Sequence, residues 1–288
     1  MNRLRRRHLE ESIFRGLMIS AFLFVMLGIG VILVTVIVKG LPALTWDMIS
    51  QTPKGGFYLG KEGGVLNAIV GSLYLAGGGT LLALVVSMPI VLYLAIYARG
   101  VNGSRWTSIV RLALDVLWGI PSIVYGAFGF VIMLAIGMRS SLLAGILVLA
   151  LLELPIMVRA MDEVIRIMPI ELKEASYALG ATRLETALKV VVRQTLPGIL
   201  TAILLAFGRG IGDAASVLFV AGYTDQMPTS LLRPVASLPL AIFFQLGTAF
   251  PEVQQRAYAS ALILTIIVLI ISLGSRGLAR RLSRNVVK

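Results

Sequence analysis

Residues 66–97 read LNAIVGSLYLAGGGTLLALVVSMPIVLYLAIY, and this stretch contains no Asp, Glu, Lys or Arg. A helix that crosses the hydrocarbon core of a bilayer needs about 20 mostly apolar residues, because each residue adds about 1.5 Å to its length. The stretch is long enough to cross once with residues to spare. It therefore predicts a membrane-spanning helix. The other apolar runs of the chain are accordingly interpreted as segments in contact with lipid.

Five further apolar runs flank this stretch, separated by charged or Gly/Pro-rich breaks: residues 14–38, 108–137, 141–158, 198–222 and 257–274. Of the 288 residues, 58% are hydrophobic and 14% are charged, which does not fit a water-soluble surface. The mean hydropathy is +0.91. The sequence therefore predicts an all-α, polytopic membrane protein with six transmembrane helices.

The distribution of Lys and Arg predicts the orientation of these helices. With six spans both termini lie on one side of the membrane. That side receives most of the 26 basic residues, which lie in the N-terminal tail, around 99–111, across 159–193 and after residue 274. Since basic residues are enriched in cytoplasmic loops, both termini are expected in the cytoplasm, in a multi-pass protein of the inner (cytoplasmic) membrane. The first run is too long for a signal peptide, which predicts an uncleaved span.

Composition also excludes several kinds of site. The chain has no cysteine and a single histidine, His8, which excludes disulfides, thiolate zinc sites and Cys or His nucleophiles. The formal charge of +12 comes from segments between the spans, so it indicates topology and predicts no nucleic-acid partner. No G-x-x-x-x-G-K-[ST] motif occurs, so the chain has no Walker A nucleotide site. We expect no catalytic residue and no metal site.

An outer segment, residues 223–256, contains four prolines around a short apolar patch at 238–246. The patch is too short to cross a bilayer. Three interpretations stay open: a re-entrant or interfacial piece, a docking surface for an outside partner, or a packed loop.

The cytoplasmic loop at residues 159–197 is longer than a connector needs, and its pattern predicts two short helices. Pro169 suits a first helical turn. One apolar stripe recurs at spacings of four, three and four residues, through Met168, Leu172, Ala175 and Leu179. Gly180 then stands where a left-handed residue ends a helix.

The second short helix is predicted to begin at a capping box, since Thr182 is followed three residues later by Glu185. Its apolar face carries Leu184, Ala187, Leu188 and Val191. The two helices make an amphipathic elbow that turns at Gly180. By pattern alone, such an elbow could lie on lipid headgroups at the cytoplasmic face.

The elbow resembles the EAA loop of ABC importer permeases, whose pattern is Glu-Ala-Ala, three residues, Gly, nine residues and Ile-x-Leu-Pro. Glu174, Ala175 and Gly180 keep that spacing, whereas Ser176 replaces the second Ala and Arg193 replaces the Pro. The resemblance implies the type I ABC importer permease fold, in which the elbow docks on a cytoplasmic ATPase. ATP and Mg would be bound by that partner, and this chain would bind no cofactor.

The resemblance assigns coupling to the ATPase to four residues of the elbow, Glu174, Ala175, Gly180 and Arg183. It also divides the chain into three parts. Residues 1–64 form an N-terminal transmembrane helix and outer segment, and residues 65–275 form the ABC transporter type I transmembrane domain with the coupling loop at about 159–197. Residues 276–288 form a basic cytoplasmic tail.

Three further segments narrow the resemblance: residues 121–126 (PSIVYG), 209–215 (RGIGDAA) and 234–243 (PVASLPLAIF). Together they resemble the PstA family of phosphate permeases more than the partner PstC family, over residues 63–274. The resemblance implies a permease subunit of an ATP-driven phosphate import system. Its partners would be a homologous, PstC-like permease subunit, an ATP-binding subunit dimer and an extracytoplasmic phosphate-binding protein.

Arg209 and Asp213 are the candidate residues of the substrate pathway. A charged side chain at the bilayer centre costs about 2.5 to 3.5 kcal/mol on insertion scales, so such residues usually face a bundle interior or a water path. The two lie four apart, on one face of the predicted helix. A guanidinium grips phosphate through two parallel hydrogen bonds, and Asp213 would hold Arg209 between transport events. The alternative is that Arg209 and Asp213 form a buried ion pair with a purely structural role in helix packing.

Other charged residues near the spans are interpreted as structural. Arg111 and Asp115 stand at i and i+4 and predict a stabilising pair within one helix. Glu153 is expected to have a local structural role. Asp162 and Glu163 are expected on a solvated face.

Three rival functions remain open. One is import of another oxyanion, such as phosphonate, sulfate or molybdate, by the same fold. A second is proton-coupled secondary transport, which would recruit Asp213, Glu153 and Asp115. An intramembrane enzyme ranks last, because no Ser–His pair, metal cluster or pair of catalytic aspartates is visible within the spans.

Overall fold

The computed structural model describes residues 2–54, 62–97 and 103–282, and within them the chain is almost entirely helical. The elements are α1 (Asn2–Gly40), a short 3₁₀ turn (Leu41–Ala43), α2 (Trp46–Ser50), the antiparallel strands β1 (Pro53–Lys54) and β2 (Glu62–Gly63), α3 (Leu66–Leu92) with a π-helical end (Tyr93–Tyr97), α4 (Gly103–Gly119), α5 (Ser122–Ala135), α6 (Leu142–Ile167), α7 (Glu171–Ala178), α8 (Arg183–Glu185), a π-helical segment (Thr186–Val191), α9 (Val192–Ile211), α10 (Leu238–Leu246) and α11 (Pro251–Leu282). This arrangement confirms the predicted all-α class.

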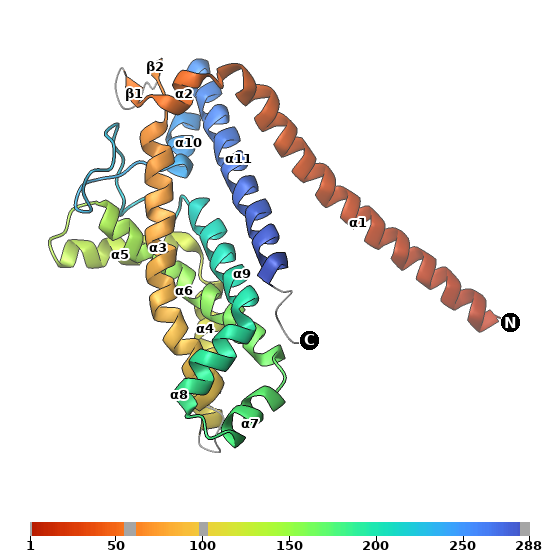
Figure 1. Cartoon of the computed structure of the whole chain (residues 1–288). Helices are drawn as coiled ribbons and strands as arrows, with labels where there is room; N and C mark the ends of the chain where they lie inside the picture. Colours follow the sequence, from red (N-terminus) through yellow and green to blue (C-terminus); the bar gives the residue numbers. More distant parts are fainter. Residues whose placement is uncertain (1, 55–61, 98–102, 283–288) are drawn as a thin grey trace.

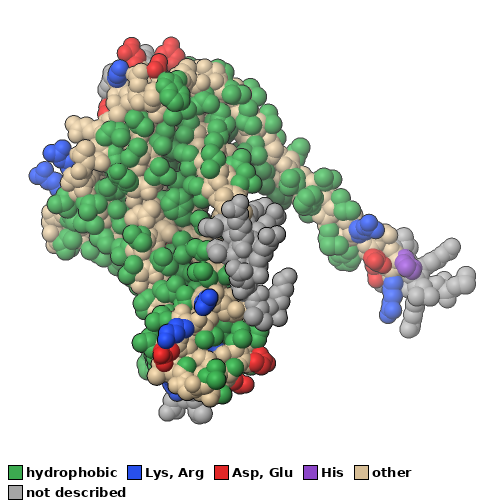
Figure 2. Space-filling model, viewed as in Figure 1, with side chains coloured by type: hydrophobic (Ala, Val, Ile, Leu, Met, Phe, Trp, Pro, Cys, Tyr) green, Lys and Arg blue, Asp and Glu red, His purple; other side chains and the backbone are tan. Residues whose placement is uncertain are grey.

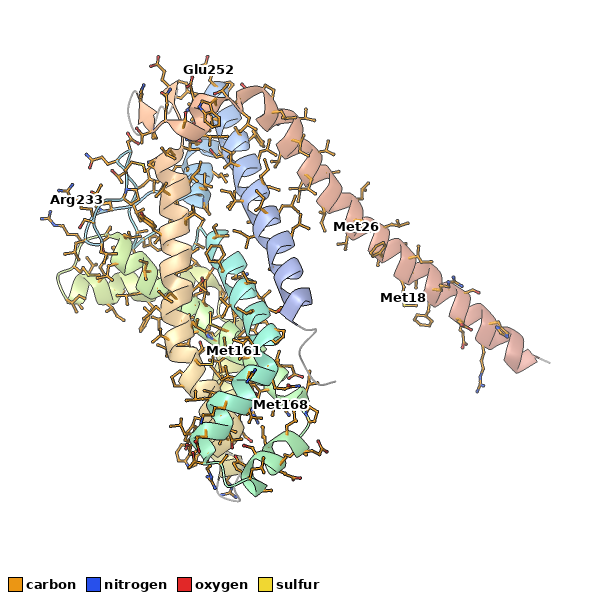
Figure 3. All side chains as sticks on the ribbon, in the orientation of Figure 1. Met18, Met26, Met161, Met168, Arg233 and Glu252 are labelled. Carbon is orange, nitrogen blue, oxygen red and sulfur yellow. The ribbon has the colours of Figure 1, made fainter. Side chains whose placement is uncertain are left out.

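Helices α3, α6, α9 and α11 form the body of the molecule (Figure 1). Pairwise packing joins α3 to α6 and α9, α6 to α9, and α9 to α11. Figure 2 shows hydrophobic side chains over most of the visible face, with charged side chains mainly at its two ends. Figure 3 shows Met161 and Met168 in the inner half of the body, where they join one apolar cluster with the ends of α3 and α9. An apolar exterior of this kind is what a bilayer requires.

Helix α1 lies apart from the body along most of its length (Figure 1). It packs against α11 near its C-terminal end, where Gly40 lies against the backbone of Tyr258. Met18 and Met26 project from it into open space, and its other large apolar side chains, such as Phe14 and Phe24, are exposed as well (Figure 3). Hydrophobic surface on this scale belongs in lipid or against another protein.

The described part of the chain holds five helices that are long and apolar enough to cross a membrane, and a sixth span if one bent pair is counted together. The bent pair is α4 and α5, which meet at an angle of 98°. The span predicted at 108–137 is therefore made of two helices that meet at a bend. The break falls at Ile120 and Pro121, because proline has no N–H to donate and disfavours helical geometry in the residue before it.

The span predicted at 198–222 also differs from the structure. Helix α9 begins earlier, in direct continuation of the π-helical segment, and ends at Ile211. Residues 212–222 form irregular turns. Three glycines stand in the five residues from Gly208 to Gly212, and glycine has the lowest helix propensity after proline, so the helix stops here.

The outer segment folds back into the bundle. Backbone N–H groups at the start of α6 donate to it, from Leu142 to the Arg233 carbonyl at 2.9 Å and from Leu143 to that of Leu231 at 2.8 Å. Helix α3 holds it from another side, since Asn67 Nδ2 donates to the Thr224 carbonyl at 2.7 Å.

The first turn of α10 is buried, and Ser72 Oγ on α3 accepts from the Leu238 N–H at 2.8 Å. Of the three interpretations of the patch at 238–246, the packed loop is wrong as to its structure, because these residues are helical, and the other two stay predictions. The patch forms a short helix against α3 and α11.

Helices α4 and α6 are joined by two ion pairs. Arg111 donates to Asp162 through Nε at 2.9 Å and through Nη2 at 3.1 Å, and Arg159 Nε lies 2.7 Å from Asp115 Oδ1. The predicted pair of Arg111 with Asp115 is therefore wrong, because each has a partner across the helix contact. Asp162 is buried, so the solvated face predicted for it is wrong too, whereas Glu163 beside it is exposed as predicted.

Replacing Asp162 with alanine is expected to lower the stability of the chain by about 2 kcal/mol or more, because it strands the Arg111 guanidinium at a largely buried contact. Thermal unfolding of the purified protein in detergent measures the loss. The matched control is Glu163→Ala, which removes the neighbouring but exposed carboxylate and should leave the unfolding temperature unchanged. Equal effects of the two substitutions would contradict the structural importance of the Asp162 pair.

Candidate functional site

Arg209 lies in the last turn of α9, and its side chain is exposed on the surface of the chain. In Figure 1, α9 ends well short of the outer ends of α3 and α11. The last turn of α9, which carries Arg209, thus lies within the length of the body and not at its end. Because a charge in the hydrocarbon region is expensive, this position calls for a water path or another subunit against the exposed side chain.

Asp213 stands just beyond the end of α9 and organises the turn that follows. Its N–H donates to the Gly210 carbonyl at 3.2 Å, and its Oδ1 accepts from the Ser216 N–H at 3.1 Å. Within the described residues no ion pair joins Asp213 to Arg209. Since the helix ends between them, the two do not share one helix face as the i, i+4 spacing predicts.

Glu153 is a polar neighbour of this region that the sequence analysis did not place in it. It is fully buried on α6, and its Oε2 accepts from Thr80 Oγ1 on α3 at 2.7 Å. Its Oε1 has no hydrogen-bond partner among the described residues. A side chain at Gly210 would collide with that oxygen, so α9 approaches Glu153 closely only because residue 210 is glycine.

The contact of Thr80, Glu153 and Gly210 joins α3, α6 and α9 one residue from Arg209. Such a contact agrees with the structural role expected of Glu153. Thr80 carries no sequence signal of its own, because a single hydroxyl in an apolar helix is common. The contact fixes the helix that carries the exposed guanidinium.

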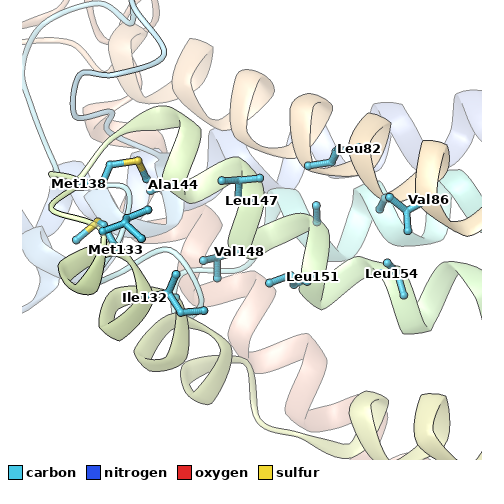
Figure 4. A pocket seen from close by; sticks show the side chains of 14 residues that line it. Leu82, Val86, Ile132, Met133, Met138, Ala144, Leu147, Val148, Leu151 and Leu154 are labelled. Atoms are coloured by element: carbon cyan, nitrogen blue, oxygen red, sulfur yellow. The ribbon is translucent and has the colours of Figure 1, made fainter.

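Figure 4 shows an apolar pocket between α3, α5 and α6 with a volume of about 370 Å³. Leu82, Ile132, Met133 and Leu151 are among its lining side chains, and all of the lining residues are apolar. No group there can donate a hydrogen bond to an anion from its side chain. The cavity is therefore separate in chemistry from the region around Arg209.

The predicted elbow is confirmed in its turn and in its cap. Gly180 has φ +79°, the left-handed conformation that glycine adopts without strain. Thr182 Oγ1 accepts from the Glu185 N–H at 3.2 Å, and Glu185 Oε2 accepts from the Thr182 N–H at 3.0 Å, which makes the predicted capping box. Pro169 is outside the first turn predicted for it, because α7 has Ile170 as its N-cap.

The burial of the elbow differs from the predicted stripes. The inward side chains of α7 are Lys173 and Ser176, while Leu179, at the end of the predicted stripe, is 88% exposed. In the second helix, Ala187 and Val191 are buried as expected. Leu184 and Leu188 are exposed. The elbow thus presents leucines outward at the end of the molecule, which suits a protein partner better than water.

The four predicted coupling residues lie together on this elbow and are exposed: Glu174, Ala175, Gly180 and Arg183. Arg183 also contacts the spanning body, since its guanidinium carbon lies 5.8 Å from the ring centroid of Tyr97. The sequence predicts a second elbow helix separate from the next span. In the structure this helix runs without a break through the π-helical segment into α9. Among the described residues, no group of three or more acidic or histidine side chains is placed to hold a metal ion.

Comparison with known proteins follows the same lines. Residues 91–288 match the sequence profile of the family described as binding-protein-dependent transport system inner membrane component. The chain is 35% identical over 246 residues to the phosphate transport system permease protein PstA of Haemophilus influenzae, covering 85% of each chain. It is 33% identical over 276 residues to the phosphate transport system permease protein PstA 1 of Mycobacterium tuberculosis H37Rv, covering 94% of this chain and 87% of that one.

Solved structures show the same architecture. The MetNI methionine ABC transporter in an inward-facing conformation gives a TM-score of 0.63 at 20% identity, over 76% of this chain and 95% of that one. A bacterial alginate ABC transporter gives 0.61 at 13% identity, over 96% of this chain and 97% of that one. At these identities the likeness concerns the fold alone.

Proposed function

The chain belongs to the family of binding-protein-dependent transport system inner membrane components, and from this premise we propose that it is the permease subunit of an ATP-driven phosphate import system. One observation supports phosphate as the substrate. Relatives named as phosphate permeases are 33 to 35% identical to this chain over most of its length. A fold shared with methionine and alginate transporters would not distinguish phosphate by itself.

The division of labour follows from the described residues. The chain lacks a Walker A motif, so the ATP and Mg that drive import belong to a partner ATPase. The exposed elbow supplies a surface for that partner through Glu174, Ala175, Gly180 and Arg183. Because α9 continues directly from the elbow, movement of the elbow reaches Arg209 along one helix.

The proposed partners are a homologous, PstC-like permease subunit, a dimer of ATP-binding subunits and an extracytoplasmic phosphate-binding protein. The exposed guanidinium of Arg209 supports a second membrane subunit, because a charge on the lipid-facing surface of an isolated chain is costly. Two such subunits facing one another would enclose a path lined from this side by the end of α9.

Arg209 is proposed to bind the anion on that path. A guanidinium offers two parallel N–H donors to a phosphate, and in a site with little water such charge-assisted bonds are strong. Asp213 keeps the turn after α9 in place through its bond to the Ser216 N–H. Its proposed role in the pathway is to shape the site beside Arg209 and not to hold the guanidinium directly.

Both termini are proposed to lie in the cytoplasm of a cell whose inner membrane holds the chain. Figure 1 places the start of α1, the end of α11 and the elbow toward one end of the molecule, and α2, β1, β2 and the start of α11 at the other. This supports the orientation that the basic residues predict. Helix α11 continues to Leu282, so the basic tail proposed for 276–288 begins as part of that helix.

Purification of the tagged chain from native membranes tests the proposal. A second permease and an ATP-binding subunit are expected to come with it. Leu179→Asp should lose the ATPase and keep the other permease, because Leu179 is exposed on the elbow. The matched control is Leu232→Asp, which is also exposed but lies in the outer segment, and it should retain both partners. Recovery of the chain only as a homo-oligomer would contradict the proposal.

A further inference from the structure

The contact between Arg183 and Tyr97 connects the elbow to a second spanning helix. The Arg183 guanidinium carbon lies 5.8 Å from the centroid of the Tyr97 ring, within the range of a cation–π interaction. Tyr97 in turn stacks on Tyr93, with ring centroids 5.9 Å apart and planes within 9° of parallel. The side chains form a continuous stack from the elbow onto the end of α3.

The elbow is internally tied, so it moves as one piece. A hydrogen bond of 2.9 Å joins the buried hydroxyls of Ser176 and Thr186, and so connects α7 to the segment after α8. The capping box fixes the turn between them, and Lys189 Nζ lies 3.2 Å from Glu185 Oε1. A displacement of α7 therefore moves Arg183 by a similar distance.

Two π-helical segments meet at this junction, Tyr93–Tyr97 at the end of α3 and Thr186–Val191 in the second half of the elbow. Such turns are rare, and they occur frequently at functional sites. Ala95 and Ile96 from the first segment belong to the same buried apolar cluster as Ala187 and Val191 from the second. The π-helical segment of the elbow thus packs against the π-helical end of α3.

Helix α3 reaches from this stack to the outer side of the molecule. From Leu66 to Tyr97 it is roughly 45 Å long, at 1.5 Å for each residue. Its outer half holds the outer segment, through Asn67 to the Thr224 carbonyl and through Ser72 to the Leu238 N–H. A displacement of its inner end is therefore carried to the outer segment by hydrogen bonds already in place.

From these contacts, and resting on the proposed function, we propose that Tyr97 is a positioning residue for transport: it passes the movement of Arg183 in the elbow to α3, and α3 passes it to the outer segment through Thr224 and Leu238. The elbow then drives two helices. One is α9, to which it is joined covalently. The other is α3, which it contacts through the Arg183 guanidinium on the face of the Tyr97 ring.

Two measurements on the complete complex test this relay. In proteoliposomes with the phosphate-binding protein, Tyr97→Leu is expected to lower the phosphate moved per ATP hydrolysed about two- to fivefold, the scale of a lost cation–π contact. Tyr97→Phe keeps the aromatic face and should keep the ratio. Arg183→Lys keeps the charge but not the planar group, and should fall between them. Phe24→Leu, which removes an exposed aromatic ring on α1 away from the relay, is the control and should behave as the unsubstituted chain.

The second measurement reports on the outer segment whatever solute is carried. The chain has no cysteine, so Thr229→Cys accepts a single spin label. Its spectrum should change between the nucleotide-free and the ATP-and-vanadate-trapped complex, and Tyr97→Leu should reduce that change while Tyr97→Phe preserves it. An undiminished change in Tyr97→Leu would overturn the relay. Failure of the unsubstituted complex to move phosphate would contradict the proposed function instead, and the spin label would still decide the relay.

Discussion

Replacing Arg209 with alanine is expected to abolish phosphate uptake while the complex stays assembled. The side chain is exposed in the chain, so its removal leaves no cavity in the described structure. What is lost is a pair of charge-assisted donors on the proposed path. Removing one preorganised donor from a site where charge must be stabilised commonly lowers rates by about 100- to 1,000-fold, and uptake should fall by at least the lower figure.

Uptake of labelled phosphate into cells or proteoliposomes measures this effect, with the amount of co-purified ATPase as the check on assembly. Arg209→Lys should retain a small part of the activity, because an ammonium keeps the charge and loses the planar, two-pronged geometry. Arg193→Ala is the matched control, since Arg193 is an exposed arginine at the other end of the same helix. Normal uptake in Arg209→Ala would remove this residue from the mechanism.

Replacing Gly71 with alanine is expected to have the largest effect on the fold. A Cβ at this position would collide with the backbone carbonyl oxygen of Ala236 and would lie 2.7 Å from Val235 Cγ2. The obstacle is main chain in the outer segment, so no side-chain rotation relieves it. Overpacking of this kind costs about 3 kcal/mol, and it should separate α3 from the outer segment.

The unfolding temperature of the purified chain and the yield of folded protein in membranes measure this loss. Gly77→Ala is the matched control on the same helix, because a Cβ there meets nothing within 4 Å. It should leave both quantities unchanged. A Gly71→Ala chain as stable as the control would show that the outer segment is not seated against α3 as the structure describes.

The spans and the elbow could be predicted because their signals are local. A long apolar run identifies a spanning helix, as at residues 66–97, and a capping box with a glycine before it identifies a turn, as at Gly180. The break between α4 and α5 was also within reach, since Pro121 marks it, but hydropathy continues across a bend and hides it. The length and hydropathy of an apolar run do not show whether its helix changes direction.

The ion pairs and the surroundings of Arg209 could not be predicted for a different reason. Spacing along one helix suggested Arg111 with Asp115 and Arg209 with Asp213. The observed partners of the first pair come from α6, and α9 ends before the second can form. Which helices become neighbours depends on packing of the whole chain. Thr80 and Glu153, which meet across 73 positions of sequence, show the same limit.

The unbroken run from the elbow into α9 has a thermodynamic consequence for the proposed transporter. Arg183 and Arg209 stand at opposite ends of one stiff element, about 39 Å long at 1.5 Å for each residue. A tilt of about 5° would move its far end by about 3 Å, roughly the length of a hydrogen bond. Linkage is reciprocal: if docking of the ATPase alters the affinity of Arg209 for the anion, occupancy of Arg209 alters the affinity of the elbow for the ATPase by the same factor. Binding of the anion at Arg209 would then change how tightly the elbow binds the ATPase, so the ATPase would respond to the presence of substrate.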